Sequence, residues 1–112
     1  MSDLHLEFAP FQPNKVDADV VVLAGDVHTG TNGIKWILEA FRDKPVIYVL
    51  GNHEFYGQKI QKLIASIKEI AQGTNVHVLD NDRVGSTRVI ANPRRCPTEP
   101  HIGFDPALVI EV

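Results

Sequence analysis

The chain has 112 residues and a net charge of -3, with 44% hydrophobic and 22% charged residues, as is typical of a single globular domain spanning residues 1–112. The acidic balance argues against nucleic acid or an anionic membrane surface as a partner. No apolar run approaches the ~18 residues that cross a bilayer, and the N-terminus lacks a signal-peptide pattern. The single cysteine, Cys96, cannot form an internal disulfide, so we expect a reducing, cytoplasmic location.

Three apolar segments predict the strands of a mainly parallel sheet. Val20–Ala24 and Val46–Leu50 are short β-branched runs without polar alternation, which is typical of strands covered on both faces. Asn75–Asp80, "NVHVLD", predicts a third strand. Helix-length segments separate the three, so the order predicts an α/β unit with right-handed crossovers.

Two segments between these strands have apolar residues at helical spacing. The first helix is expected over residues 34–41, capped by Thr31 or Asn32 and stopped by Pro45. The second is expected over residues 60–70 and closed by Gly73. Further along, Thr87–Pro93 and Ala107–Val112 predict a C-terminal strand pair, separated by a proline-rich stretch.

Polar side chains follow two of the predicted strands. Asp26 comes after the first strand, and Asn52 and His53 come after the second. The functional crevice of an open α/β sheet lies at these carboxyl ends. Near the N-terminus, Asp3 and His5 are two residues apart, and on an extended segment such side chains point to the same side. Oxygen and nitrogen ligands of this mixture suit Mn, Fe or Zn, so the pattern predicts a divalent metal site.

Each of these residues also has a simpler interpretation. Asp26 alone is equally well explained as a helix cap. Asp3 and His5 alone resemble surface residues near a terminus, and Asn52 and His53 alone resemble turn residues. Three such groups in one short chain favour the metal site over three separate coincidences.

"SDLH" (Ser2–His5), "AGD" (Ala24–Asp26) and "GNHE" (Gly51–Glu54) resemble, in order and spacing, the first three signature blocks of the calcineurin-like metallophosphoesterases. The resemblance covers essentially the whole chain. It implies a metallophosphoesterase-like α/β fold and hydrolysis of phosphate mono- or diesters, with metal-activated water attacking phosphorus. One or two divalent cations would neutralise the charge on the attacking and leaving oxygens.

The resemblance also implies which residues hold the metals. Asp3 and His5 would bind the first ion, Asp26 would bridge both ions, and Asn52 would bind the second. His28 follows Asp26 on the same loop and is a further candidate ligand, with a solvated loop histidine as the alternative.

The resemblance implies a separate role for the histidine of the third block. His53 would donate a proton to the leaving oxygen or stabilise the phosphoryl group. Glu54 or Asp3 would orient its ring, so His53 and Asp3 are the candidate catalytic residues. His77 lies in the middle of the predicted third strand and is expected to be a strand-face histidine instead.

The chain also departs from the family pattern. Two later histidine blocks are missing, and the apolar strand that enters "SDLH" is short, so the chain resembles a member with an internal deletion and a clipped first strand. Only Asp26 and Asn52 remain for the second metal, fewer than the three protein ligands that such sites generally use.

Three hypotheses follow for a chain of this kind. It is a metal-dependent phosphoesterase acting on a small phosphoester, a metal-binding but catalytically impaired remnant, or a non-catalytic α/β interaction module. Metal content and hydrolysis of an aryl phosphodiester distinguish them. The missing strands and the exposed edge expected at "MSDLHL" also predict a homo-oligomer, most simply a two-fold dimer.

Overall fold

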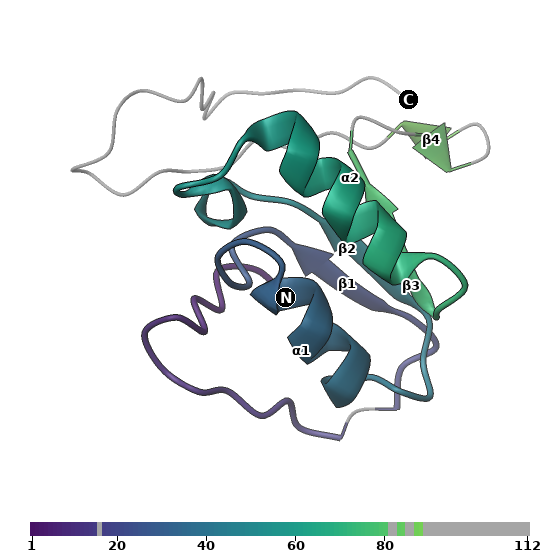
Figure 1. Cartoon of the computed structure of the whole chain (residues 1–112). Helices are drawn as coiled ribbons and strands as arrows, with labels where there is room; N and C mark the ends of the chain where they lie inside the picture. Colours follow the sequence, from purple (N-terminus) through teal and green to yellow (C-terminus); the bar gives the residue numbers. More distant parts are fainter. Residues whose placement is uncertain (16, 81–82, 85–86, 89–112) are drawn as a thin grey trace, which may run out of the picture.

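The computed structural model describes residues 1–15, 17–80, 83–84 and 87–88. It contains the predicted α/β unit, with both helices and all three strands of the parallel sheet (Figure 1). Each strand of this sheet lies within its predicted range. In chain order the elements are β1 (Val21–Ala24), α1 (Asn32–Ala40), β2 (Val46–Val49), the short 3-10 helix η1 (His53–Phe55), α2 (Ile60–Ala71) and β3 (Val76–Leu79).

The sheet has the order β1-β2-β3, and both strand pairs are parallel. The register places Val21 beside Val46 and Val46 beside Val76, so corresponding residues of the three strands share a face. Strands added in one direction place their connecting helices on the same side when both crossovers have one hand. Figure 1 shows α1 and α2 together in front of the sheet, as this rule requires.

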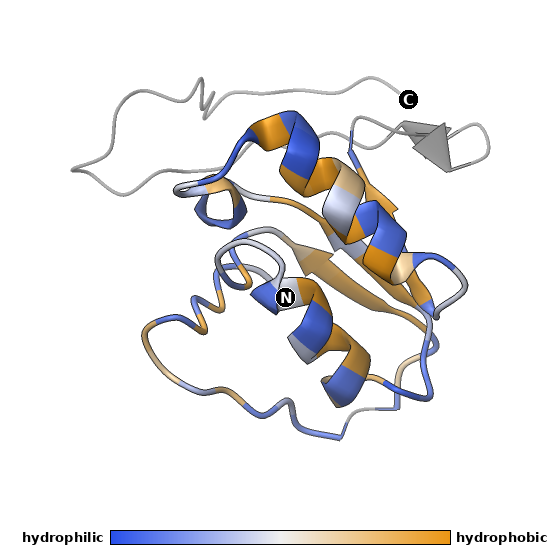
Figure 2. Cartoon of the chain, viewed as in Figure 1, coloured by the Kyte–Doolittle hydropathy of each residue, from blue (hydrophilic) through white to orange (hydrophobic). Residues whose placement is uncertain are grey.

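The hydrophobic core lies between the two helices and the face of the sheet that they cover. Figure 2 shows helices banded in orange and blue, as expected for elements that bury one side only. Gly73, with φ +73°, turns the chain after α2 as predicted. The buried apolar residues of the core are Leu23, Val27, Ile34, Ile37, Val46, Tyr48, Leu63, Ile67, Ala71 and Val76.

The opposite face of the sheet is less covered than the sequence predicts. Val22 is 44% exposed, and Ala24 and His77 on the same face are also exposed. The expectation of cover on both faces is therefore wrong for β1. The physical reason is that both connecting helices lie on one side, which leaves the other without a helix among the described residues.

The N-terminal segment runs beside β1 and bonds to it. The Met1 amine donates to the Val22 carbonyl at 2.7 Å, and the Ala24 N–H donates to the Met1 carbonyl at 2.8 Å. The Asp3 N–H then donates to the Gly25 carbonyl at 3.1 Å. The bare edge expected at "MSDLHL" is therefore wrong where this segment lies along β1.

The strand pair after the sheet differs from the prediction. β4 (Arg83–Val84) pairs antiparallel with β5 (Thr87–Arg88), so the strand predicted from Thr87 begins where expected but has a partner that the sequence did not indicate. The remainder of that strand, the predicted strand Ala107–Val112 and Cys96 lie outside the described residues. None of the helices in the described part of the chain is long and apolar enough to cross a membrane.

The homo-oligomer stays a prediction, and the exposed apolar side chains on the outer face of β1 favour it. We expect light scattering at micromolar concentration to give the mass of a dimer, and a dilution series to move that mass towards the monomer. A monomeric mass at every concentration, together with a cooperative thermal transition, would contradict the prediction.

Candidate metal centre

The carboxyl ends of β1 and β2 continue into two loops that touch each other. Gly25 has φ +85°, and a Cβ there would lie 3.0 Å from the Gly51 Cα. A Cβ on Gly51 would overlap the Asp26 carboxylate and lie 2.7 Å from the Asp26 nitrogen. Glycine at both positions therefore lets the loops approach closely enough to hold the Asp26 carboxylate against the second loop.

Glu54 joins the two loops through a fully buried carboxylate. Its Oε1 accepts hydrogen bonds from the Val27 N–H and the Tyr48 hydroxyl, both at 2.8 Å. Its Oε2 accepts from the Gly51 N–H at 2.9 Å and the Asp26 N–H at 3.1 Å. Burial, followed by the charge of Glu54, raises the pKa of the Tyr48 hydroxyl far above its usual value, so this group stays a donor.

Three of the predicted ligands come together beside these loops. Asp3, His5 and Asp26 each offer one ligand atom, and the three atoms lie within 4.8 Å of one another. The His5 Nε2 lies 4.0 Å from the Asp3 Oδ1. Asp26 is buried, His5 is half-buried and Asp3 is exposed, so the group opens to solvent on the side of Asp3.

These three residues share an unusual backbone conformation. Within the described part of the chain, the non-glycine residues with positive φ are Asp3 (54°), His5 (46°) and Asp26 (53°). The left-handed region costs about 1–2 kcal/mol for each such residue, and strain of this kind concentrates at functional sites. The extended geometry assumed for Asp3 and His5 is therefore wrong, and their convergence comes from left-handed turns instead.

The loop after β2 orients the central carboxylate. The His53 N–H donates to the Asp26 Oδ1 at 2.9 Å. Asn52 is half-buried beside it, and its Nδ2 donates to the Tyr56 hydroxyl oxygen at 3.2 Å. Asn52 thus lies at the same edge of the sheet as Asp26, and its role as a ligand of a second ion stays a prediction.

The carboxylate beside the His53 ring is Glu7, which the sequence analysis did not identify. The His53 Nδ1 lies 2.8 Å from the Glu7 Oε1. The orienting role expected of Glu54 or Asp3 stays a prediction; in the structure Glu54 binds the loop donors and Asp3 lies in the other group of ligands. Alternation in "SDLHLE", with Asp3 and His5 followed by Glu7, was the available signal.

Glu7 also lies close to His5, which makes a second group of ligands. Single atoms of His5, Glu7 and His53 lie within 4.8 Å of one another. Burial acts to raise the pKa of Glu7, but its own backbone N–H and the two histidines outweigh this effect and lower it. The carboxylate is therefore ionised at neutral pH.

Two aromatic side chains flank His53. Its ring centroid lies 4.5 Å from that of Tyr56 and 6.4 Å from that of Phe8. Tyr56 is 47% exposed and Phe8 is 78% exposed. The candidate site therefore has an apolar rim that remains open to solvent.

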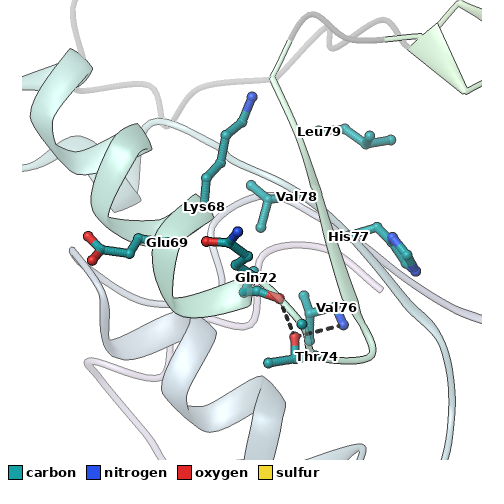
Figure 3. A pocket seen from close by; sticks show the side chains of 10 residues that line it. Lys68, Glu69, Gln72, Thr74, Val76, His77, Val78 and Leu79 are labelled. Atoms are coloured by element: carbon teal, nitrogen blue, oxygen red, sulfur yellow. Dashed lines mark hydrogen bonds between the residues drawn. The ribbon is translucent and has the colours of Figure 1, made fainter.

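The other candidate histidines lie elsewhere. The His28 Nδ1 accepts a hydrogen bond from the Thr29 N–H at 2.7 Å, and His28 is in neither group of ligands, so the structure does not bring it to the metal centre. His77 is exposed on β3, and Figure 3 shows its ring pointing away from α2, as expected of a strand-face histidine. The hollow drawn there, about 560 Å³, lies between α2 and β3 and contains none of the candidate ligands.

Comparison with known families agrees with this geometry. The family model described as calcineurin-like phosphoesterase matches residues 1–97, and the chain therefore belongs to this family. The match includes all three motifs that carry the resemblance in the sequence. No curated protein and no solved structure matches the chain.

We expect Glu54→Gln to destabilise the fold strongly. The side-chain NH₂ group would replace an oxygen that accepts two hydrogen bonds. Each buried donor left without an acceptor costs roughly 1–3 kcal/mol of stability. Urea unfolding followed by circular dichroism measures this loss. Glu69→Gln, on the exposed side of α2, should change the free energy of unfolding by less than about 0.5 kcal/mol. Equal midpoints for the two variants would contradict the role of Glu54.

Proposed function

We propose that the chain is a metal-dependent hydrolase of phosphate mono- or diesters. The observation that carries this proposal is the convergence of Asp3, His5 and Asp26, each in the left-handed backbone conformation, at the carboxyl end of the sheet. A fold that needed these residues only for packing would have no reason to accept the strain. Membership of the calcineurin-like phosphoesterase family supports the same reaction class.

The residues at this position fit a divalent transition ion. Two carboxylates and one imidazole form the mixed oxygen and nitrogen set that Mn, Fe or Zn accepts. Asp3, His5 and Asp26 would hold one ion, and Asn52 would join Asp26 in holding a second. A bound ion would supply charge neutralisation at the phosphoryl oxygens and would lower the pKa of a water molecule.

The remaining groups of the site act on the substrate and on the ligands. The His53 N–H fixes the Asp26 carboxylate through the 2.9 Å hydrogen bond. The His53 ring, with Nδ1 beside Glu7, would hold a proton at Nε2 for the leaving oxygen. The exposed rim of Phe8 and Tyr56 favours a small phosphoester with an apolar or aromatic leaving group.

The catalytically impaired remnant is the second candidate. The observation that favours it is the small ligand set of the second ion, for which Asp26 and Asn52 are the candidates among the described residues. Sites of this kind generally use three protein ligands or more. Bound metal without hydrolysis of an aryl phosphodiester would support this candidate over the proposed enzyme, and neither property would support an interaction module.

Asp26→Asn should remove most of the bound metal. The amide can still accept the His53 N–H bond, so the change removes charge and little structure. We expect the metal affinity to fall by more than the ~10–100-fold that is caused by substituting residues that only support the metal ligands. Elemental analysis of the purified protein measures it, with His77→Ala on β3 as the control. Equal metal content in the wild type and Asp26→Asn would refute the assignment.

His53→Ala should lower kcat while metal content stays nearly constant. General acid catalysis contributes ~10²–10⁴-fold, and this is the expected loss for an aryl phosphodiester. Steady-state kinetics at saturating metal measures the loss. If metal content falls together with kcat, His53 is a ligand and its proposed catalytic role is wrong.

A further inference from the structure

Glu7 contacts both functional histidines, and the proposed function gives it no role of its own. Building on that function, we propose that Glu7 is a positioning residue that sets the tautomer and ring orientation of His5 and His53 together. One carboxylate would thereby prepare a metal ligand and a proton donor at the same time.

The argument begins with the position of the Glu7 Oε1. This atom lies 2.8 Å from the His53 Nδ1 and 3.4 Å from the His5 Nδ1. The two imidazole rings lie edge to face, with centroids 4.3 Å apart. An ionised carboxylate only accepts hydrogen bonds, so each Nδ1 that faces it carries its proton. The shorter bond, to His53, is the stronger of the two.

For His5, the Nδ1–H form leaves the lone pair on Nε2. That atom is on the side of the metal centre, 4.0 Å from the Asp3 Oδ1. Metal-ligating histidines almost always donate their other ring N–H to a carboxylate, a carbonyl or water, which raises the basicity of the ligand. Glu7 provides this support for His5.

For His53, the same contact makes Nε2 the ring nitrogen available to the reaction. At His53, Glu7 acts through the imidazole, because its Oε1 faces the Nδ1 side of the ring.

The buried surroundings of Glu7 leave its carboxylate in contact with the two imidazole rings. Its side chain is 14% exposed, and its Oε2 is buried without a hydrogen-bond partner in the described part of the chain. A buried carboxylate oxygen without a donor is costly, and such atoms usually have a functional reason. Here the two histidines are the side-chain partners that compensate for the buried charge.

The first test needs no catalytic activity. Long-range ¹H–¹⁵N spectra of the metal-free wild type, recorded about two units above the ordinary histidine pKa of about 6.5, should show His5 and His53 mainly as Nδ1–H tautomers. The Nδ1–H share should fall in Glu7→Ala and stay unchanged in Glu39→Gln, an exposed position on α1. Nε2–H tautomers at both histidines in the wild type would overturn the proposal, whether or not the variants fold.

The second test is titration with Zn²⁺ alone. Glu7→Gln should weaken binding ~10–100-fold, because it removes support from His5 without removing a ligand. His53→Ala should leave the affinity unchanged. If Glu7→Gln and His53→Ala each abolish a bound ion, then His5, Glu7 and His53 are themselves a metal site and the proposal is wrong.

The third test uses the hydrolysis of an aryl phosphodiester at saturating metal. Glu7→Gln should lower kcat in the wild-type background and cause a smaller further loss in His53→Ala, because part of the effect of Glu7 acts through that ring. Independent, multiplicative losses would overturn the positioning role. A wild type without turnover would instead refute the proposed function, and the tautomer and Zn²⁺ tests would still decide the role of Glu7.

Discussion

The Glu54 carboxylate is the interaction on which the rest of this site depends. It accepts two hydrogen bonds at each oxygen, from donors on the loop after β1, the loop after β2 and the Tyr48 side chain. A fully buried charge is stable only when its desolvation is compensated, and here four donors provide the compensation. The two loops, which approach each other at Gly25 and Gly51, are thereby held in one arrangement.

That arrangement makes the left-handed backbone of the ligands possible. Asp26 has its N–H bonded to Glu54, its carbonyl to the His5 N–H and its Oδ1 to the His53 N–H. Each of these bonds constrains the residue that carries the strain. The strain at Asp3 and His5 is compensated in a similar way, since their N–H groups donate to the carbonyls of Gly25 and Asp26. The conformation of the N-terminal segment is therefore fixed by its hydrogen bonds to β1 and to the loop that follows it.

Much of the fold could be predicted from the sequence because it depends on local apolar patterns. The runs that became β1, β2 and β3 and the stripes that became α1 and α2 needed no knowledge of distant residues. The grouping of Asp26 with Asp3 and His5 followed partly from the rule for strand ends, although the backbone conformation behind it did not. Positive φ at non-glycine residues leaves no signal in composition or periodicity.

Glu7 could not be predicted for a related reason. Its hydrogen bond to His53 joins residues 46 positions apart and depends on the turn that follows His5, where the Phe8 N–H donates to the His5 carbonyl at 2.9 Å. Only the alternation in "SDLHLE" marked it, and that alternation implied an extended segment, which the structure does not have. The exposed outer face of β1 could not be predicted either, because a strand with an uninterrupted apolar sequence has the same pattern whether one face or both faces are covered.

The charges of the site give a final reason to connect its fold with metal binding. Asp3, Glu7, Asp26 and Glu54 place four carboxylates around two histidines, and the ion pairs found there among the described residues involve histidine as the only cationic partner. Backbone N–H groups and the Tyr48 hydroxyl donate to Glu54, and the two histidines lie beside the Glu7 Oε1, but Asp3 and Asp26 share one ligand group in which His5 is the other member among the described residues. Like charges at such a distance oppose the compact state. A divalent ion would remove this repulsion, and because it would bind the folded arrangement alone, its binding free energy would also stabilise the fold.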